Sequence, residues 1–289
     1  MRRNNILLAA AAILVMAGCG SSNNTPLPEQ KPGEPGTQTV RAFSHRGGRL
    51  EHDENTMPAF VASWEAGYTG FETDVRMTSD GHLVITHDHT LERTTNGSGI
   101  LEEKTFDEVM ALTTKKGNKM LTVDELSAFF KGKSGLYVEW ELKTKPVELY
   151  PEERLHEYCN KLYDAVMCNK PEDAMYVFTS SDPRGLLYLR EQHPDVNLLW
   201  ITSKPVNSET IAACLELGIP RLGAKMDGTS RASVKKAHDA GLIVSLWPGQ
   251  SVADFMLGTY LGCDFMCTDV PLAVMDFMQK RASWVNVIY

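Results

Sequence analysis

Short apolar runs alternate with longer stretches of helical period from residue 40 onwards. The runs are rich in Val, Ile and Phe, a composition that favours buried strands of a parallel sheet. We expect eight such strands, near residues 40–44, 71–75, 136–141, 175–179, 197–201, 220–225, 242–247 and 264–268. Helices are expected between most of them, over residues 55–66, 151–167, 183–192, 208–217, 230–240 and 251–261.

Repeated strand–helix units predict an α/β fold, a single TIM (β/α)8 barrel over residues 40–289. A doubly wound open sheet is the alternative. It is disfavoured because no Gly-x-Gly-x-x-Gly follows the first strand, and because the candidate catalytic residues come from several strands.

One segment interrupts the alternation between the second and third strands. Residues 76–134 are far longer than a crossover needs. A turn at 78–81 and a returning strand at 82–86 predict a hairpin. Two short helices are expected at 105–112 and 122–130, and the whole insertion is interpreted as a small cap subdomain over the barrel mouth.

The N-terminal residues precede the fold. Arg2 and Arg3, an apolar stretch and small residues indicate a signal peptide over residues 1–18. Met16-Ala17-Gly18-Cys19 resembles the lipobox of bacterial lipoproteins, which implies lipidation of Cys19; a plain secretory signal is the alternative. Residues 19–39 read as a flexible tether, rich in Pro, Gly, Ser and Asn. Export and anchoring to a bacterial membrane, facing the periplasm or the surface, are therefore expected.

Charge and cysteine content limit the classes of ligand and partner that we expect. The net charge is −8 and the sequence has no long Lys/Arg run, so nucleic acid is not an expected partner. No Cys-x-x-Cys occurs, which disfavours a zinc cluster. The oligomeric state is left open.

Acidic residues gather where the expected strands end, the place of active sites in parallel barrels. Glu72 and Asp74 are two residues apart on one expected strand and therefore share a face, and Glu141 ends the next barrel strand. Three carboxylates make a hard oxygen site suited to Ca²⁺ or Mg²⁺. For each alone, a salt bridge with Lys or Arg is the alternative.

Two histidines in polar turns flank these acids. His45 ends the first expected strand and His87 follows the hairpin, so both are candidates for acid–base catalysis near neutral pH. Arg46 and Lys143 are candidates for binding a phosphoryl group, although Lys143 could simply neutralise Glu141.

Several of these residues lie in motifs that resemble the glycerophosphodiester phosphodiesterase family. The motifs are His45-Arg46-Gly47, Glu54-Asn55-Thr56, Glu72-Thr73-Asp74-Val75, Thr78–Gly81, His87-Asp88, Leu91–Gly99, Glu141-Leu142-Lys143 and Thr268–Pro271. The resemblance covers about residues 40 to 280 and implies a barrel with an inserted cap and a divalent metal, Ca²⁺ or Mg²⁺.

The resemblance also implies roles for single residues. Glu72, Asp74 and Glu141 would be metal ligands, with Glu54 as an addition to the metal shell; His45 and His87 would be the acid–base pair; Arg46 and Lys143 would contact phosphate. Independently of the resemblance, Trp247 at a strand end is a candidate for binding substrate, and Asn55 for binding substrate or orienting a histidine. The implied reaction is hydrolysis of a glycerophosphodiester to sn-glycerol 3-phosphate and an alcohol.

The sequence departs from the family pattern at two places. Ser180-Ser181-Asp182 stands where members often carry Ser-Phe, and Trp247-Pro248-Gly249-Gln250 stands where they often carry Trp-Thr-Val-Asn. These changes would reshape the alcohol pocket. A lysophospholipase D or a phosphodiesterase like the phosphatidylinositol-specific phospholipases C therefore stays open, as does a non-catalytic lipoprotein that binds glycerophosphodiesters. The retained histidines disfavour the last.

Overall fold

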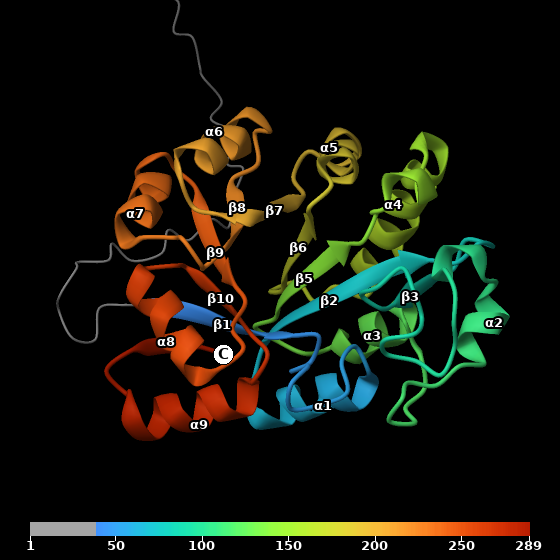
Figure 1. The fold of residues 1–289 in the computed structure, drawn as a ribbon, viewed down its shortest axis with the longest axis horizontal. Helices are drawn as coiled ribbons and strands as arrows, with labels where there is room; N and C mark the ends of the chain where they lie inside the picture. The colour runs from blue at the N-terminus through green and yellow to red at the C-terminus, as the bar shows by residue number, and fades with distance from the viewer. Residues whose placement is uncertain (1–38) are drawn as a thin grey trace, which may run out of the picture.

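Parallel strands close into a barrel in the computed structural model, which describes residues 39–289 (Figure 1). The strand order is β1-β10-β9-β8-β7-β6-β5-β2, and pairing of Ser44 with Phe71 and of His45 with Glu72 joins β2 back to β1. The barrel strands are β1 (Thr39–His45), β2 (Gly70–Met77), β5 (Tyr137–Leu142), β6 (Met175–Ser180), β7 (Asn197–Pro205), β8 (Arg221–Lys225), β9 (Ile243–Trp247) and β10 (Phe265–Thr268). The predicted TIM barrel is confirmed.

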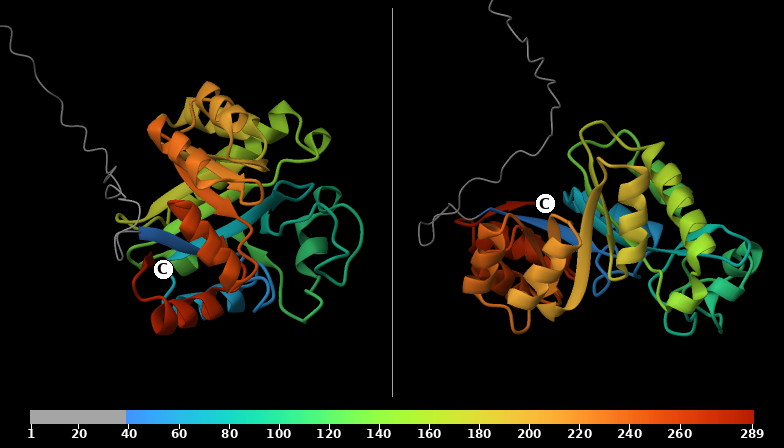
Figure 2. Two further views of the ribbon diagram at one scale, coloured as in Figure 1. Left: turned by 60° about the vertical axis from the view of Figure 1, so that its left-hand side comes forward. Right: turned by 90° about the horizontal axis from the view of Figure 1, so that it is seen from above.

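Helices surround the barrel on its outside (Figures 1 and 2). They are α1 (Met57–Ala66), α3 (Val123–Phe130), α4 (Glu152–Met167), α5 (Pro183–Gln192), α6 (Ser208–Glu216), α7 (Arg231–Asp239), α8 (Val252–Leu261) and α9 (Pro271–Arg281). Local signals explain their ends: α1 has a proline in its first turn and stops at Gly67, whose φ of 107° needs a residue without Cβ. The sequence pattern indicated each of them except α9.

Strand residues are buried on both faces, as expected in a parallel sheet covered by helices. One apolar cluster fills the barrel interior: Phe43, Tyr137, Val177, Leu199, Phe265 and Cys267. A larger cluster lies between the strands and the surrounding helices. Phe43 lies two residues before His45 in β1, so the polar site begins where the interior core ends.

The insertion after β2 extends the sheet outward. β3 (Leu83–Ile85) pairs antiparallel with β2, and β4 (Leu121–Thr122) pairs antiparallel with β3, which confirms the predicted hairpin. With α2 (Phe106–Met110), these strands enclose a small core of their own: Val84, Leu91, Leu101, Val109 and Met120. The insertion projects to one side of the barrel (Figure 1).

The expected bounds of the insertion, 76–134, reach beyond β3, β4 and α2 at the C-terminal end. They include α3, which packs in the outer ring of helices. The ring of Phe130 lies 5.2 Å from that of Phe71 and 6.0 Å from that of Trp140, and Ser127 Oγ donates to Ala165 O of α4 at 2.9 Å. A crossover between parallel strands needs such a helix on the outside of the barrel, and α3 supplies it between β2 and β5.

The structure describes the C-terminal end of the chain but not its N-terminal segment. Residues 1–38 fall outside the described residues, and with them the predicted signal peptide, Cys19 and all of the tether except Thr39, which is already in β1. At the other end β11 (Asn286–Ile288) runs parallel to β1 and adds an outer strand. Among residues 39–289, no helix combines the length and the apolar character needed to cross a membrane.

Candidate active site

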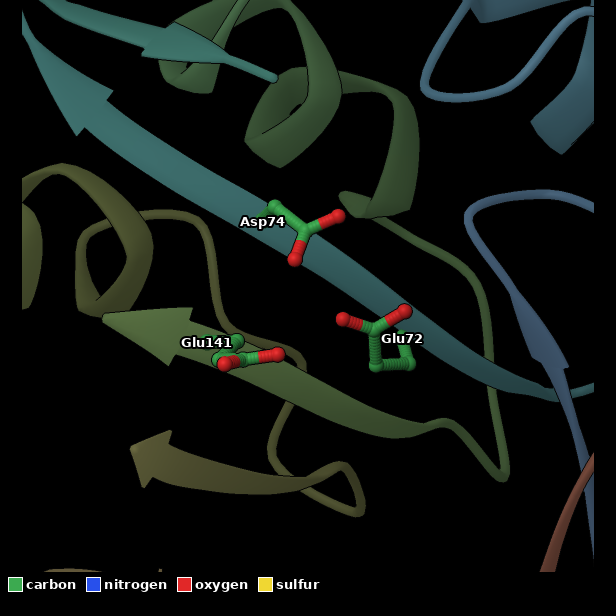
Figure 3. A group of neighbouring side chains, drawn as sticks. All are labelled: Glu72, Asp74 and Glu141. Atoms are coloured by element: carbon green, nitrogen blue, oxygen red, sulfur yellow. The ribbon is translucent and has the colours of Figure 1, made fainter. Parts of the chain in front are cut away.

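Three carboxylates meet at the C-terminal ends of β2 and β5. Strand register sets Asp74 opposite Glu141, and Glu72 lies on the same face of β2 (Figure 3). One oxygen from each residue lies within 4.8 Å of the others. The sequence placed these residues on neighbouring strands, and the structure brings their side chains together.

The cluster has the chemistry of a hard-cation site. All its donors are oxygens, and Glu72 Oε1 and Asp74 Oδ1 are buried without a hydrogen-bond donor. Burial, and then the charges of Asp74 and Glu141, raise the pKa of Glu72 well above its ordinary value. A dication between the carboxylates would remove this repulsion and satisfy the unpaired oxygens, so the residues present fit Ca²⁺ or Mg²⁺.

Two cations already neutralise Asp74. Arg46 Nε lies 3.1 Å from Asp74 Oδ2, and Lys143 Nζ lies 3.6 Å from Asp74 Oδ1 and 2.9 Å from Glu141 Oε1. Burial would raise the pKa of Asp74, but the charges of Arg46, His87 and Lys143 outweigh it and hold that pKa well below the ordinary range. Arg46 and Lys143 both line the central cavity, where they can also reach an anionic ligand.

The turn after β1 aims a backbone donor at the cluster. Arg46 has a left-handed backbone, with φ of 53°, which is uncommon for a residue other than glycine. In this conformation its N–H donates to Glu72 Oε2 at 3.2 Å. The strain at Arg46 therefore accompanies a contact to a candidate metal ligand.

His45 belongs to a carboxylate–histidine pair. Its Nδ1 lies 2.5 Å from Asp269 Oδ1, and Asp269 Oδ2 in turn lies 2.7 Å from Arg49 Nη2. Burial, and then the charge of Arg46, lower the pKa of His45 against the opposing effect of Asp269. We assign the proton of the neutral ring to Nδ1, because Asp269 is an acceptor there. Nε2, 3.6 Å from Glu72 Oε2, is then free to accept a proton.

His87 faces the same cavity from the insertion. Thr86 N donates to Asp74 O at 3.0 Å, which ties this segment to β2, and His87 Nδ1 lies 2.6 Å from Asp88 Oδ1. Burial lowers the pKa of His87, and the charges of Lys143 and Arg46 lower it further, although Asp74 acts in the opposite direction. Each histidine therefore has a carboxylate partner that orients its ring.

A cavity of about 600 Å³ opens over these groups. His87 is the only residue of the segment 76–134 among those lining it, so the insertion contributes this one side chain to the cavity wall. Its other wall comes from the ends of β7 and β9, with Trp200, Ile201 and Trp247.

Two predicted site residues have other partners. Glu54 lies outside the carboxylate cluster: Arg46 Nη1 binds it at 3.0 Å, and Arg93 binds both its oxygens at 2.7 and 2.8 Å. Asn55 donates to Asp74 Oδ2 at 2.8 Å and accepts from Thr73 Oγ1 at 3.2 Å, and it is absent from the lining of the large cavity. Asn55 thus supports a candidate ligand instead of facing substrate.

Sequence reasoning missed the partners of these residues. Asp269 and Arg93 lie within the motifs Thr268–Pro271 and Leu91–Gly99, but nothing along the chain indicates that they pair with His45 and Glu54, and Arg49 lies outside these motifs. The ring closure that brings Asp269 to His45 is not visible along the chain.

The site combines three carboxylates, two histidines and the side chains of Arg46 and Lys143 at the mouth of a parallel α/β barrel. This combination is typical of metal-dependent enzymes that act on phosphate esters. Comparison with known proteins narrows this class. The sequence model of the glycerophosphoryl diester phosphodiesterase family matches residues 45–273. The chain belongs to that family.

Individual relatives agree with this placement. A glycerophosphodiester phosphodiesterase of Caldanaerobacter subterraneus subsp. tengcongensis is 40% identical over 121 residues, which cover 39% of this chain and 49% of that protein. The chain thus aligns with about half the length of that relative.

Solved structures share the fold. A structure from Silicibacter pomeroyi, described as that of a candidate glycerophosphoryl diester phosphodiesterase, superposes with a TM-score of 0.77 at 24% identity, over 86% of this chain and 95% of that one. A phosphodiesterase of Oleispira antarctica, solved in complex with its product sn-glycerol-3-phosphate, superposes with a TM-score of 0.73 at 21% identity, over 83% and 97%.

Proposed function

We propose that this protein hydrolyses glycerophosphodiesters to sn-glycerol 3-phosphate and an alcohol. One observation carries the proposal: His45 and His87, each oriented by a carboxylate, line the same cavity as Glu72, Glu141, Arg46 and Lys143. Family membership and the product found in the Oleispira antarctica phosphodiesterase support this substrate class.

The histidines would move the protons. One imidazole takes the proton of the attacking hydroxyl while the other gives a proton to the departing alkoxide, as the bond from phosphorus to the alcohol oxygen breaks. The attacking group would be the glycerol 2-hydroxyl of the substrate, and the resulting cyclic phosphate would then be opened by water. Arg46 and Lys143 would hold the phosphoryl oxygens during both steps.

Glu72, Asp74 and Glu141 would hold the divalent cation, Ca²⁺ or Mg²⁺. Bound there, the cation would polarise the phosphoryl oxygens and stabilise the charge that develops on them. Asn55 and Arg46 keep Asp74 oriented, and the backbone N–H of Arg46 keeps Glu72 oriented, so the ligand set is held by hydrogen bonds.

The test is release of glycerol 3-phosphate from glycerophosphocholine, glycerophosphoethanolamine and glycerophosphoinositol, with and without EDTA. We expect release that stops on chelation and returns with Ca²⁺ or Mg²⁺. Activity that is indifferent to chelation, or that survives His45→Ala, would contradict the mechanism. Binding of these compounds without release would favour the non-catalytic alternative.

An acylated substrate is a second candidate because the wall at β7 and β9 is apolar in part, with Leu199, Trp200 and Ile201. A lysophospholipase D, or an enzyme like the phosphatidylinositol-specific phospholipases C, would use the same histidines. Turnover of lysophosphatidylcholine and phosphatidylinositol, compared with their deacylated forms, separates these activities. Preference for the acylated forms would replace the first proposal.

We also propose export and a lipid anchor at Cys19, on the basis of the signal sequence and lipobox alone. The cell fraction that contains the protein tests this. Wild type is expected in the membrane fraction, and Cys19→Ser in the soluble fraction. Equal partition of the two would contradict the anchor.

A further inference from the structure

Arg76 contacts the two segments that carry His87 and Lys143. It follows Asp74 by two residues along β2 and therefore lies on the same face of the strand. Its side chain is buried, with 3% of the residue exposed. Its Nε donates to His87 O at 2.8 Å, and its Nη1 donates to Lys143 O at 3.1 Å and Lys145 O at 3.3 Å. One guanidinium therefore bridges the insertion and the end of β5.

A buried acid balances this charge. Glu102, in the insertion, lies 2.6 Å from Arg76 Nη1 and is 6% exposed. Tyr150 OH donates to the same oxygen at 3.1 Å. An unpaired guanidinium would be costly to bury here, and the carboxylate of Glu102 offsets that cost where Arg76 reaches the carbonyl oxygens.

Strand pairing leaves these carbonyl groups for Arg76. Lys143 N donates to Val75 O at 3.2 Å, and Thr86 N donates to Asp74 O at 3.0 Å. Both segments are therefore fixed to β2 on their N-terminal side. Arg76 binds a carbonyl group further along each segment, which is that of His87 in the insertion and that of Lys143 after β5.

We propose that Arg76 is a positioning residue that sets the separation between the imidazole of His87 and the ammonium of Lys143. This inference rests on the proposed function, in which those two groups act on the same phosphoryl group. The planar guanidinium donates in several directions at once, whereas an ammonium on a flexible stem does not hold three carbonyl groups in a fixed arrangement. Misplacement of a reacting group by about 1 Å can cost about 100-fold in rate.

Arg76→Lys tests the proposal, with Arg154→Lys as the matched control. Arg154 Nη2 donates to Met77 O and Thr78 O, both at 2.9 Å, so it also binds carbonyl groups at the end of β2 but touches neither catalytic segment. We expect kcat for glycerophosphoethanolamine to fall about 10- to 100-fold in Arg76→Lys, with KM within about twofold of wild type. Arg154→Lys should keep both constants.

Two further variants separate positioning from folding. Glu102→Gln keeps an acceptor for Arg76 and should retain most of kcat. Arg76→Met combined with Glu102→Met removes both buried charges, and such replacements are often neutral for stability, so this protein should unfold near the wild-type temperature while kcat stays low. Calorimetric titration with Mg²⁺ should be unchanged in every variant, since Glu72, Asp74 and Glu141 are retained.

Each outcome decides the matter. Wild-type kcat in Arg76→Lys, accompanied only by a lower thermal midpoint, would reduce Arg76 to a structural role and leave the proposed function intact. If Arg76→Lys shows no cooperative unfolding transition, the double variant decides, and wild-type kcat there overturns the inference. A wild-type protein that releases no glycerol 3-phosphate would overturn both this inference and the proposed function.

Discussion

The two arcs of the barrel rim differ in how their polar groups are held. On the arc of β1, β2, β5 and β10, charged side chains are tied to one another: His45 to Asp269, and Asp74 to Arg46 and Lys143. On the arc of β7 and β9, the cavity is lined by Trp200, Ile201, Thr202, Ser203 and Trp247, none of which carries a charge. Under the proposed function, the first arc would fix the position of the phosphoryl group, and the second would select the alcohol.

The two departures from the family pattern lie at the ends of β6 and β9. Ser181, Pro248 and Gln250 line the cavity, so substitutions there reshape its wall. Asp182 does not line it: its side chain caps α5, accepts from Thr144 Oγ1 at 2.9 Å and binds Arg184. The change to Asp182 therefore acts on the helix start and not directly on the alcohol pocket.

Removal of the metal should have the largest effect, because it acts on the charged arc alone. Chelation is expected to lower the rate at least about 10,000-fold, since polarisation of the phosphoryl oxygens is worth several kcal/mol. The thermal midpoint should also rise when Ca²⁺ or Mg²⁺ is added to metal-free protein. Glu72→Gln should reduce this rise, while raising the midpoint of the metal-free protein, because it removes the carboxyl group whose pKa burial and the neighbouring charges raise at a cost to stability.

Loss of a histidine should follow in size. His45→Ala is expected to lower kcat about 100- to 10,000-fold, the range for an acid–base group, without a matching change in the thermal midpoint. His193→Ala is the control, since His193 stacks on Tyr163 outside the site. Steady-state kinetics on one glycerophosphodiester checks both. Equal losses in the two variants would point to a stability effect.

Substitutions on the uncharged arc should have a smaller effect, which falls on KM. Trp247→Ala and Trp200→Ala are expected to raise KM by about 10-fold, because a large apolar contact worth about 1.5 kcal/mol is lost. The order of preference among alcohols should change with them. Competition between two glycerophosphodiesters measures this order. If it is preserved in both variants, the alcohol is selected elsewhere.

The smallest effect is expected on stability, away from both arcs. A hydrogen bond from His238 Nε2 to Asp264 Oδ2, 2.9 Å long, raises the pKa of His238. Because the pKa is higher in the folded protein, protonation of His238 stabilises the fold. This contribution is fully present below the unfolded pKa of about 6.5 and is lost as the pH rises through the folded pKa. His238→Gln should thus be destabilised against wild type by under about 1 kcal/mol at pH 5.5, and by less at pH 8.5.

Urea unfolding of both proteins at the two pH values measures this difference. The side chain of His238 is 33% exposed, so solvent screening keeps the effect small. A difference that grows with pH would contradict the assignment of the raised pKa to His238.

The barrel could be predicted because its eight strands and, except for α9, its surrounding helices have local signals. Buried strands appear as short apolar runs, and helices appear through their period and their end residues, as in α1 and α5. The bounds of the insertion could not be obtained in this way. Residues 123–130 have a helical pattern in either arrangement, and only the packing of Phe130 against Phe71 and Trp140 assigns α3 to the barrel.

By itself, the sequence determined which side chains share one face of one strand. Glu72 and Asp74 are two residues apart, and this spacing is enough to set them side by side. Tertiary structure alone decided which residues meet across strands. Asp269 reaches His45 only because the barrel closes, Glu54 is paired by arginines instead of joining the acids, and Arg76 of β2 meets Glu102 of the insertion. The period of a chain reports the faces of single elements, whereas register and closure depend on the free energy of packing the whole barrel.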